Sequence, residues 1–205
     1  MRAMTSSSWL ALETSTDTLS IAVARGAQTW RYNGAGAAQS SPNMIPRSLA
    51  LLAEAGLKVA DLQAVVFGRG PGAFTGLRTS CAVAQGLAYG AGVKVLPIDT
   101  LLAVAEEARC AQAESKPTQV DAQGQAFAAT PTQRVLSVMD ARMEQVYVAA
   151  YEFTPHCANH ADTNAQPGAP LPGTWQCVQA PTLQSPETLT WPEAWQGQTF
   201  VVAGN

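Results

Sequence analysis

Residues 64–78 read AVVFGRGPGAFTGLR, and this stretch decides the fold because it joins a short apolar strand to a helix through a glycine-rich turn. The apolar run Ala64–Phe67 is typical of a buried strand. Pro71 and Gly72 predict the central positions of a type II turn. A helix is expected over residues 75–89, and the backbone N–H groups at its start are suited to holding an anion.

Three interpretations of this stretch stand side by side. Gly68, Gly70 and Ala73 formally match the dinucleotide-binding pattern GxGxxG/A. The second interpretation is a purely structural turn between a strand and a helix. The third is a partner surface, because Phe74 would otherwise be exposed and Arg78 lies where the helix dipole disfavours a cation.

Small residues recur every four positions along the expected helix, at Gly76, Ser80, Ala84 and Ala88. Such a stripe permits the close approach of another helix. It equally permits packing against this chain's own sheet, so both interpretations stay open.

The sequence on both sides of this stretch predicts a mixed sheet. Strands are expected at residues 9–13, 19–23 and 28–32, which form an antiparallel meander. A buried strand is expected at residues 93–96. Strands that alternate with helices after a meander indicate a sheet with helices on its faces.

Two further helices flank the expected strands. One is expected from Pro42 to Gly56, with Ser41 as its cap and an apolar side made of Ile45, Leu49, Leu52 and Ala53. The other begins at Asp99 or Thr100 and runs to about Cys110.

The pattern of the opening strands occurs twice. An acid at the end of a strand is followed at the sixth, eighth and tenth positions by apolar residues: Glu13 by Leu19, Ile21 and Val23, and Asp140 by Val146, Val148 and Ala150. A later strand then ends in glycine, at Gly68 and at Gly204. This repeat predicts two similar lobes, of which the second is incomplete.

The repeat suggests a division of the chain. Residues 1–111 are expected to form the first lobe and residues 134–205 a partial second lobe. Residues 112–133 are rich in Ala, Gln, Thr and Pro, which predicts a flexible insertion, and a further loop insertion is expected near residues 154–174.

Composition excludes several classes of protein. The charged fraction is 13%, about half the roughly 25% of a typical soluble domain. A net charge of −3 and a pI of about 5.3 disfavour a stand-alone nucleic-acid-binding protein, which needs a basic face. No run approaches the roughly 18 apolar residues of a membrane span, and the N-terminus lacks the apolar core of a signal peptide. The scattered Cys81, Cys110, Cys157 and Cys177 are expected to be reduced thiols, which favours the cytoplasm.

Other polar residues have ordinary explanations. His156 and His160 have the spacing of a helical metal pair but lie in a loop-like stretch, where solvated side chains are expected. Asp140 and Arg142 are interpreted as polar turn residues, with an ion pair or a remnant phosphate site as alternatives. No spacing of Ser, His and Asp indicates a protease triad.

Three segments together carry a resemblance to a known family: LALETSTDTLSIAVA at residues 10–24, GRGPGAFTGLR at 68–78 and VMDARMEQVYVAAY at 138–151. In this order they resemble the TsaB (YeaZ) family of bacterial tRNA-modification proteins. The resemblance implies an α/β architecture, the actin-like ATPase (ribonuclease H-like) fold, with two related lobes of mixed β-sheets flanked by helices.

The resemblance also implies a function. TsaB proteins support the addition of a threonylcarbamoyl group to N6 of the adenosine next to the anticodon, in tRNAs that read codons starting with A. They bind the catalytic paralogue TsaD, the ATPase TsaE joins them, and family members form homodimers through the N-terminal lobe. Contact with tRNA is then indirect. No cofactor is expected in the isolated chain, and ATP or ADP is expected only at the assembled complex.

The expected partner interface follows from the unusual stretch. It comprises Gly70, Pro71, Gly72, Phe74, Thr75, Gly76, Arg78, Ser80 and Ala84. The glycines and the proline shape the turn, Phe74 anchors the partner, and Arg78 pairs with an acid or an anion.

Two departures from active relatives argue against catalysis and a metal site. Neither Glu13 nor Asp140 is followed by glycine, which hinders close approach of the backbone to a phosphate. TsaD-like proteins bind a metal through paired histidines on the first long helix, and residues 40–52 contain none. The alternative function is an ATP-dependent small-molecule kinase or ATPase of the same fold, with turnover that depends on Glu13 or Asp140.

Overall fold

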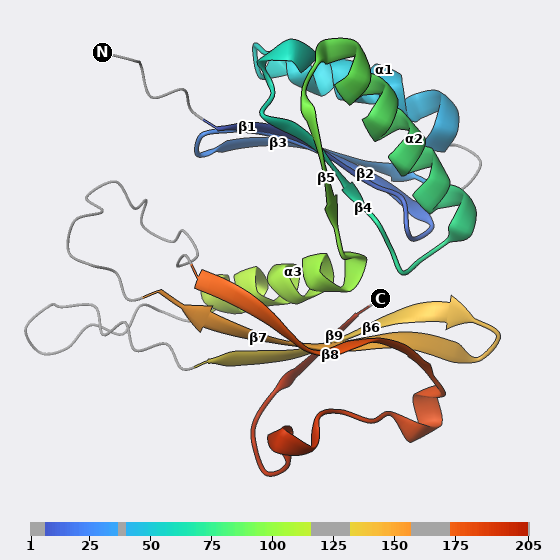
Figure 1. Cartoon of the computed structure of the whole chain (residues 1–205), viewed down its shortest axis with the longest axis vertical. Helices are drawn as coiled ribbons and strands as arrows, with labels where there is room; N and C mark the ends of the chain where they lie inside the picture. Colours follow the sequence, from blue (N-terminus) through green and yellow to red (C-terminus); the bar gives the residue numbers. More distant parts are fainter. Residues whose placement is uncertain (1–6, 37–39, 116–131, 157–172, 205) are drawn as a thin grey trace, which may run out of the picture. The chain divides into compact units, whose positions relative to one another are not determined.

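The computed structural model describes residues 7–36, 40–115, 132–156 and 173–204. The chain divides into two compact units, Met1–Thr100 and Leu101–Asn205, each built around its own sheet (Figure 1). Within the described ranges, no helix is long and apolar enough to cross a membrane.

The first unit contains a five-stranded mixed sheet in the order β3-β2-β1-β4-β5. The central pair β1–β4 and the pair β4–β5 are parallel, whereas β1–β2 and β2–β3 are antiparallel. The predicted meander is therefore confirmed. The strand bounds are Ser8–Glu13, Thr18–Arg25, Gln28–Ala35, Ala64–Gly68 and Lys94–Ile98 for β1 to β5.

Two helices, α1 (Ser40–Glu54) and α2 (Phe74–Ala91), cover one face of this sheet (Figure 1). The core between them and the sheet is formed by the alternate residues of β1 and β2, which are buried on that side: Leu10, Leu12, Leu19, Ile21 and Val23. Burial of every second side chain is the expected result of the two-residue period of a strand.

The predicted apolar side of α1 is wrong in part. Of the four residues expected to be buried, only Leu52 is; Ile45 and Leu49 are 43% and 47% exposed, and Ala53 is exposed as well. The buried side consists of Met44, Ser48, Leu51, Leu52 and Ala55. Both sets recur at helical spacing, so the periodicity alone does not select between them. The helix also begins at Ser40, so Ser41 is not its cap.

The strand predicted to be buried near residues 93–96 is an exposed edge strand. Every residue of β5 from Lys94 to Pro97 is exposed, including Val95 and Leu96. The reason is positional: β5 ends the sheet, and α2 lies mainly over β4 rather than over β5.

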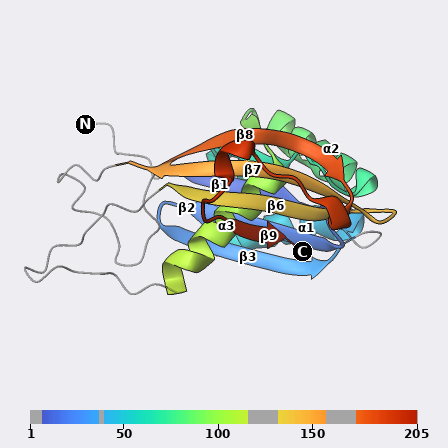
Figure 2. The ribbon, with the colours of Figure 1, turned by 90° about the horizontal axis from the view of Figure 1, so that it is seen from below.

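The second unit repeats the topology of the first. Its sheet has the order β8-β7-β6-β9, with β6–β7 and β7–β8 antiparallel and β6–β9 parallel (Figure 2). This matches β3-β2-β1-β4 strand for strand, so the repeat predicted from Glu13 and Asp140 is confirmed at the level of topology. The bounds are Gln133–Arg142, Gln145–Pro155, Gly173–Gln184 and Val201–Gly204 for β6 to β9.

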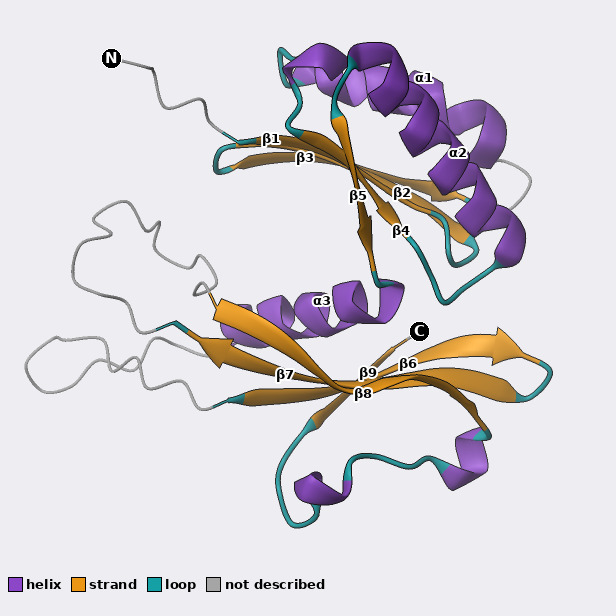
Figure 3. Ribbon diagram, in the orientation of Figure 1, coloured by secondary structure: helices purple, strands orange, loops and turns teal. Residues whose placement is uncertain are grey.

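Helix α3 (Thr100–Ser115) packs on the second sheet (Figure 3). Leu101 and Ala105 share a buried cluster with Val135, Met139 and Tyr151. The division therefore falls between Thr100 and Leu101 rather than at residue 111, where the sequence predicts it. On the opposite face, Trp195 is buried with Leu136, Val148 and Ala150.

Strand β8 has no counterpart among the strands predicted from the sequence. Two register shifts against β7, between Val148 and Ala150 and between Ala150 and Tyr151, disturb the alternation of its side chains. The insertion predicted at 112–133 spans the connection between α3 and β6, and the one predicted at 154–174 spans the connection between β7 and β8. Most of both, residues 116–131 and 157–172 with Cys157 and His160, lies outside the described residues.

The β6–β7 hairpin ends in three consecutive non-glycine residues with positive φ. Arg142, Met143 and Glu144 have φ angles of 65°, 53° and 58°. A two-residue hairpin loop of type I′ needs such angles at both central positions, and glycine, asparagine or aspartate usually occupies them. The Asp140 Oδ1 atom accepts a hydrogen bond from the Arg142 N–H at 2.7 Å, so the interpretation as a polar turn holds.

A hydrogen-bonded cluster joins α3 to β7 and β8. The Glu106 carboxylate accepts hydrogen bonds from Arg109 at 2.6 and 2.7 Å and from Trp175 Nε1 at 2.9 Å, and the Arg109 guanidinium lies 4.3 Å from the Phe153 ring centroid. Burial opposes ionisation of Glu106, but the hydrogen bonds from Arg109 and Trp175 outweigh it and lower the pKa of Glu106. The hydrogen bonds that Arg109 donates to Glu106 raise the pKa of Arg109, and burial raises the pKa of the Cys110 thiol.

Replacing Glu106 with Gln is expected to destabilise the second unit in a pH-dependent way. Because the folded-state pKa of Glu106 lies below its ordinary value of 4.5, the ionised carboxylate stabilises the fold above that value, and this contribution is lost as the pH falls through the folded-state pKa. Urea unfolding of wild type and Glu106→Gln from about pH 7 to about pH 3 measures the difference. A difference that does not shrink at low pH contradicts the ionic contribution.

Candidate partner-binding surface

The turn between β4 and α2 lies directly against the turn between β1 and β2. A Cβ at Gly72 would lie 2.7 Å from the Ser15 carbonyl oxygen, and one at Gly76 would overlap the Thr14 carbonyl oxygen. Two hydrogen bonds hold the turns together: Ala73 N donates to Ser15 O, and Thr14 Oγ1 donates to Gly76 O, each at 2.7 Å. These glycines therefore serve a close backbone approach within the chain.

The predicted type II turn at Pro71 and Gly72 is wrong. Gly72 has a φ of 159°, which is close to extended backbone, whereas Gly70 has a φ of 100° in the region that favours glycine. The Gly70–Pro71 peptide bond is cis, and the Gly70 carbonyl accepts a hydrogen bond from Thr100 N at 3.0 Å.

The acid at the end of β1 orders its own turn. Glu13 Oε1 accepts a hydrogen bond from Ser15 N at 2.6 Å, and a Cβ at Gly68 would overlap the Glu13 carboxyl group. The Glu13 carboxyl group thus occupies the space beside Gly68. Together these contacts favour the structural interpretation of the glycine-rich stretch over the dinucleotide-binding one.

Part of the expected interface is buried inside the first unit. Gly76, Ser80 and Ala84 line the side of α2 that faces the sheet, and Ser80 and Ala84 are fully buried. They cannot form a partner surface on the folded unit. The alternative interpretation of this stripe, packing against the chain's own sheet, is the one that the structure shows.

The remaining expected residues differ in exposure. Phe74 is 66% exposed, and Thr75 and Arg78 are exposed as well, whereas Pro71 and Gly72 are half-buried and Gly70 is buried. The Arg78 guanidinium lies 3.7 Å from the centroid of the Phe74 ring. In the described part of the chain, Arg78 has no ion-pair partner.

A second stripe of small residues is exposed on α2. It runs through Thr75, Thr79, Ala82, Gly86 and Gly90, of which only Thr79 is half-buried. The helix therefore carries small residues on two sides, and the exposed one is displaced from the predicted stripe by about one-quarter of a turn or more.

The exposed apolar residues of α1 lie on its flank toward α2. Arg47 reaches over the Tyr32 ring of β3, at 4.8 Å, which marks the flank away from α2. Ile45 and Leu49 each lie two positions from Arg47, which places them roughly 200° around the helix. Sequence reasoning missed both as surface residues, because their spacing is that of a core-facing stripe.

We call the exposed side of these two helices the outer helical face. It is formed by Ile45, Leu49, Phe74, Thr75, Arg78, Ala82, Gly86 and Tyr89. These residues are apolar or small except Arg78, and the other long polar or charged side chains exposed on the two helices are Arg47, Glu54 and Gln85. Exposed apolar side chains gathered in this way are typical of a protein-binding surface.

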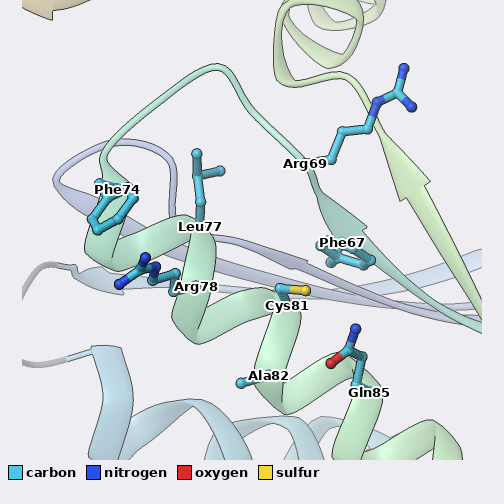
Figure 4. A pocket seen from close by; sticks show the side chains of 8 residues that line it. All are labelled: Phe67, Arg69, Phe74, Leu77, Arg78, Cys81, Ala82 and Gln85. Carbon is cyan, nitrogen blue, oxygen red and sulfur yellow. The ribbon is translucent and has the colours of Figure 1, made fainter.

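A groove of about 480 Å³ opens beside α2 (Figure 4). Helix α2 contributes Phe74, Leu77, Arg78, Cys81, Ala82 and Gln85, and β4 contributes Phe67. Arg69 lies at its edge and pairs with Asp99, with distances of 2.6 and 3.1 Å between their nitrogen and oxygen atoms. Cys81 is half-buried and lines this groove.

Of the two histidines, only His156 lies among the described residues. His156 follows strand β7, and its Nε2 atom lies 2.7 Å from Thr174 Oγ1 of β8. Among the described residues, no group of three His, Cys, Asp or Glu side chains could hold a metal ion.

Comparison with known proteins identifies the family. The family model for TsaD, tRNA N6-adenosine threonylcarbamoyltransferase, matches residues 36–166. The chain belongs to this family. The glycine-rich turn, the exposed side of α2 and the first strands of the second unit all fall within the matched residues.

Two curated relatives are tRNA threonylcarbamoyladenosine biosynthesis proteins named TsaB. TsaB from Haemophilus influenzae is 34% identical over 67% of this chain and 51% of its own length. TsaB from Escherichia coli is 29% identical over 70% of this chain and 54% of its own length. The chain thus spans about half the length of the curated relatives that it matches.

A solved structure supports the same placement. YeaZ from Pseudomonas aeruginosa is 28% identical, with a TM-score of 0.70 over 97% of this chain and 76% of that chain. The resemblance to TsaB (YeaZ) and the expected actin-like fold, with its mixed sheets flanked by helices, are therefore confirmed.

Proposed function

We propose that this chain is a non-catalytic, TsaB-type subunit that binds the catalytic paralogue TsaD. In that role it supports the addition of a threonylcarbamoyl group to N6 of the adenosine next to the anticodon. The family membership and the TsaB relatives support this role.

The observation that carries the proposal is the outer helical face. Ile45 and Leu49 are large, apolar and exposed beside the small residues Ala82 and Gly86 of the neighbouring helix. Small side chains let a partner helix approach closely, and the apolar ones supply buried area on association. Phe74, Thr75 and Arg78 extend this surface, whereas Gly70, Pro71 and Gly72 shape the turn that positions them.

The two acids at the strand ends support a non-catalytic role. Glu13 accepts a hydrogen bond from Ser15 N, and Asp140 accepts one from Arg142 N, so each carboxylate orders its own turn. An acid that serves phosphate or metal chemistry would instead be directed toward a ligand.

The other expected partners belong to the same proposal. TsaE joins the complex, tRNA is contacted through it, and the isolated chain pairs with a second copy when TsaD is absent. ATP or ADP binds at the assembled complex. The place of action is the cytoplasm, where tRNA is modified.

Reconstitution tests the function directly. Purified TsaD, TsaE and the enzyme that makes threonylcarbamoyl-AMP are incubated with tRNA, threonine, bicarbonate and ATP, with and without this chain. Nucleoside mass spectrometry is expected to show modified adenosine only when the chain is present. Equal modification without the chain would refute the proposal, and ATP turnover by the isolated chain that is lost in a Glu13→Gln variant would support the kinase or ATPase alternative.

A charge reversal links the function to the surface. Arg78→Glu is expected to abolish co-purification with TsaD and to reduce modification to the level without the chain, because the exposed arginine would become an acid at the interface. Arg31→Glu, at an exposed position on β3, is the matched control and is expected to leave both unchanged. Loss of co-purification in both variants would point to a general charge effect instead.

A further inference from the structure

The groove lies along the flank of α2 that carries Leu77, Cys81 and Gln85, and Ala82 of the exposed small-residue stripe also lines it. Its wall is formed by Leu77, Cys81 and Gln85, and its floor by Phe67 of β4 (Figure 4). At 100° per residue, Cys81 and Gln85 lie well away from Thr79 and Val83 on the other flank of the helix. All groove residues belong to the first unit.

The floor of the groove continues onto the exposed edge strand. Val65 pairs with Val95 and Phe67 with Pro97, so these four side chains lie on the same face of the sheet. Val65 is buried under α2, whereas Val95 and Pro97 are exposed because the helix lies mainly over β4. An apolar floor is therefore left open beside the helix.

The edge of β5 is poorly suited to pairing with another strand. The Ile98 carbonyl accepts a hydrogen bond from Arg69 N, so the alternate residues of β5 bond to β4 and the main-chain groups of Val95 and Pro97 point outward. Pro97 has no N–H to offer there. A side chain inserted between α2 and β5 fits this arrangement better than an added strand does.

The mouth of the groove is positively charged. Arg69 forms an ion pair with Asp99, whereas Arg78 lies over the Phe74 ring and has no ion-pair partner in the described ranges. Residues 1–100 contain eight Lys or Arg and five Asp or Glu, which gives a net charge of +3. Residues 101–205 contain four Lys or Arg and ten Asp or Glu, which gives a net charge of −6. A ligand that is apolar at one end and anionic at the other complements this groove.

We propose that the groove receives an apolar side chain of TsaD whose neighbouring carboxylate pairs with Arg78. This inference rests on the proposed function and adds a second contact to it. Phe74 and Arg78 belong both to the outer helical face and to the mouth of the groove, so a partner docked on that face reaches the groove without leaving the surface. A buried apolar anchor with a charged pair at its rim is a common arrangement for the strongest contacts of an interface.

Affinity measurements with two matched tryptophan variants test the anchor. Gln85→Trp fills the groove and is expected to weaken TsaD binding by about tenfold or more in calorimetry. Gln176→Trp places the same side chain at an exposed glutamine of β8 and is expected to change the affinity by less than about twofold. Arg78→Met is expected to weaken binding and to reduce its dependence on salt concentration, because the charged pair is removed.

The thiol of Cys81 gives an independent measure of occupancy. Alkylation by iodoacetamide, followed by mass spectrometry of each cysteine-containing peptide, is expected to slow at Cys81 when TsaD is added. Cys177, which is exposed on β8, serves as the internal reference and is expected to react at the same rate in both samples.

The outcomes separate this inference from the function on which it rests. TsaD that binds normally to Gln85→Trp, with Cys81 alkylated as fast as in the isolated chain, overturns the groove contact and leaves the subunit role intact. Wild-type chain that does not bind TsaD at all overturns both. Protection of Cys81 by raising the concentration of the chain alone, with no further slowing when TsaD is added, would show that a second copy and not TsaD occupies the groove, which also contradicts the proposal.

Discussion

Replacing Gly76 with Ala is expected to destabilise the first unit by about 2–4 kcal/mol. The new Cβ would overlap the Thr14 carbonyl oxygen, which is a backbone atom and cannot rotate away. The two turns would have to separate, and the hydrogen bond from Thr14 Oγ1 to Gly76 O would be lost with them. That bond alone contributes about 1 kcal/mol, and the forced displacement of packed backbone accounts for the rest.

Gly86→Ala provides the matched control in the same helix. A Cβ at Gly86 meets no atom within 4 Å, and the residue is exposed. Alanine there is expected to stabilise the helix by about 0.5–1 kcal/mol, because glycine carries an entropic cost in a helix interior. Urea unfolding followed by circular dichroism compares the two variants with wild type. Equal stability of Gly76→Ala and Gly86→Ala would contradict the close backbone contact between the β1–β2 turn and the start of α2.

The two sides of α2 show why the sequence predicted the wrong interface stripe. Gly76, Ser80 and Ala84 and the exposed Thr75, Ala82 and Gly86 are both small, and both sets repeat at helical spacing. The choice between them is made by Thr14, which lies 62 residues away from Gly76 and packs on it. Local periodicity contains no information about a contact of that separation.

A similar ambiguity affects α1. Met44 and Ser48 are buried, whereas Ile45 and Leu49, one residue later along the helix, are exposed. Hydrophobicity favours burial of Ile45 and Leu49, because isoleucine and leucine are much more hydrophobic than serine. Ser48 can be buried because its hydroxyl donates a hydrogen bond to the Met44 carbonyl at 2.7 Å, so the hydroxyl group keeps a partner. An apolar stripe left exposed in this way is the signal that could have indicated a partner surface.

The repeat was predictable because it depends on strand spacing alone. The alternation after Glu13 and after Asp140 is local, and it correctly predicted two antiparallel pairs. The register of the later strands was not. In the first unit, Phe67 pairs with Leu12, so Gly68 comes level with Glu13, the acid at the end of β1. In the second unit, Gly204 pairs with Val138, which lies two residues before the corresponding acid, Asp140. A shift of two residues keeps the same side chains inward, so the alternating pattern cannot reveal it.

The double variant Ile45→Asp, Leu49→Asp is expected to abolish TsaD binding, with a loss of affinity of about 100-fold or more. Both side chains are already exposed, so the isolated chain is expected to fold as before. On association they would be buried, and each carboxylate would then lose its hydration without gaining a partner. Analytical ultracentrifugation of the chain with TsaD measures the loss, and thermal unfolding checks the fold.

Leu183→Asp is the control that distinguishes an interface from a general effect of added charge. Leu183 lies on β8 of the second unit and is 51% exposed, close to the 47% of Leu49. The substitution introduces the same carboxylate at a position of similar exposure, away from the outer helical face. It is expected to leave TsaD binding within about twofold of wild type. Strong binding by the α1 double variant, or equal loss in the β8 variant, would show that the exposed side of α1 is not where the partner docks.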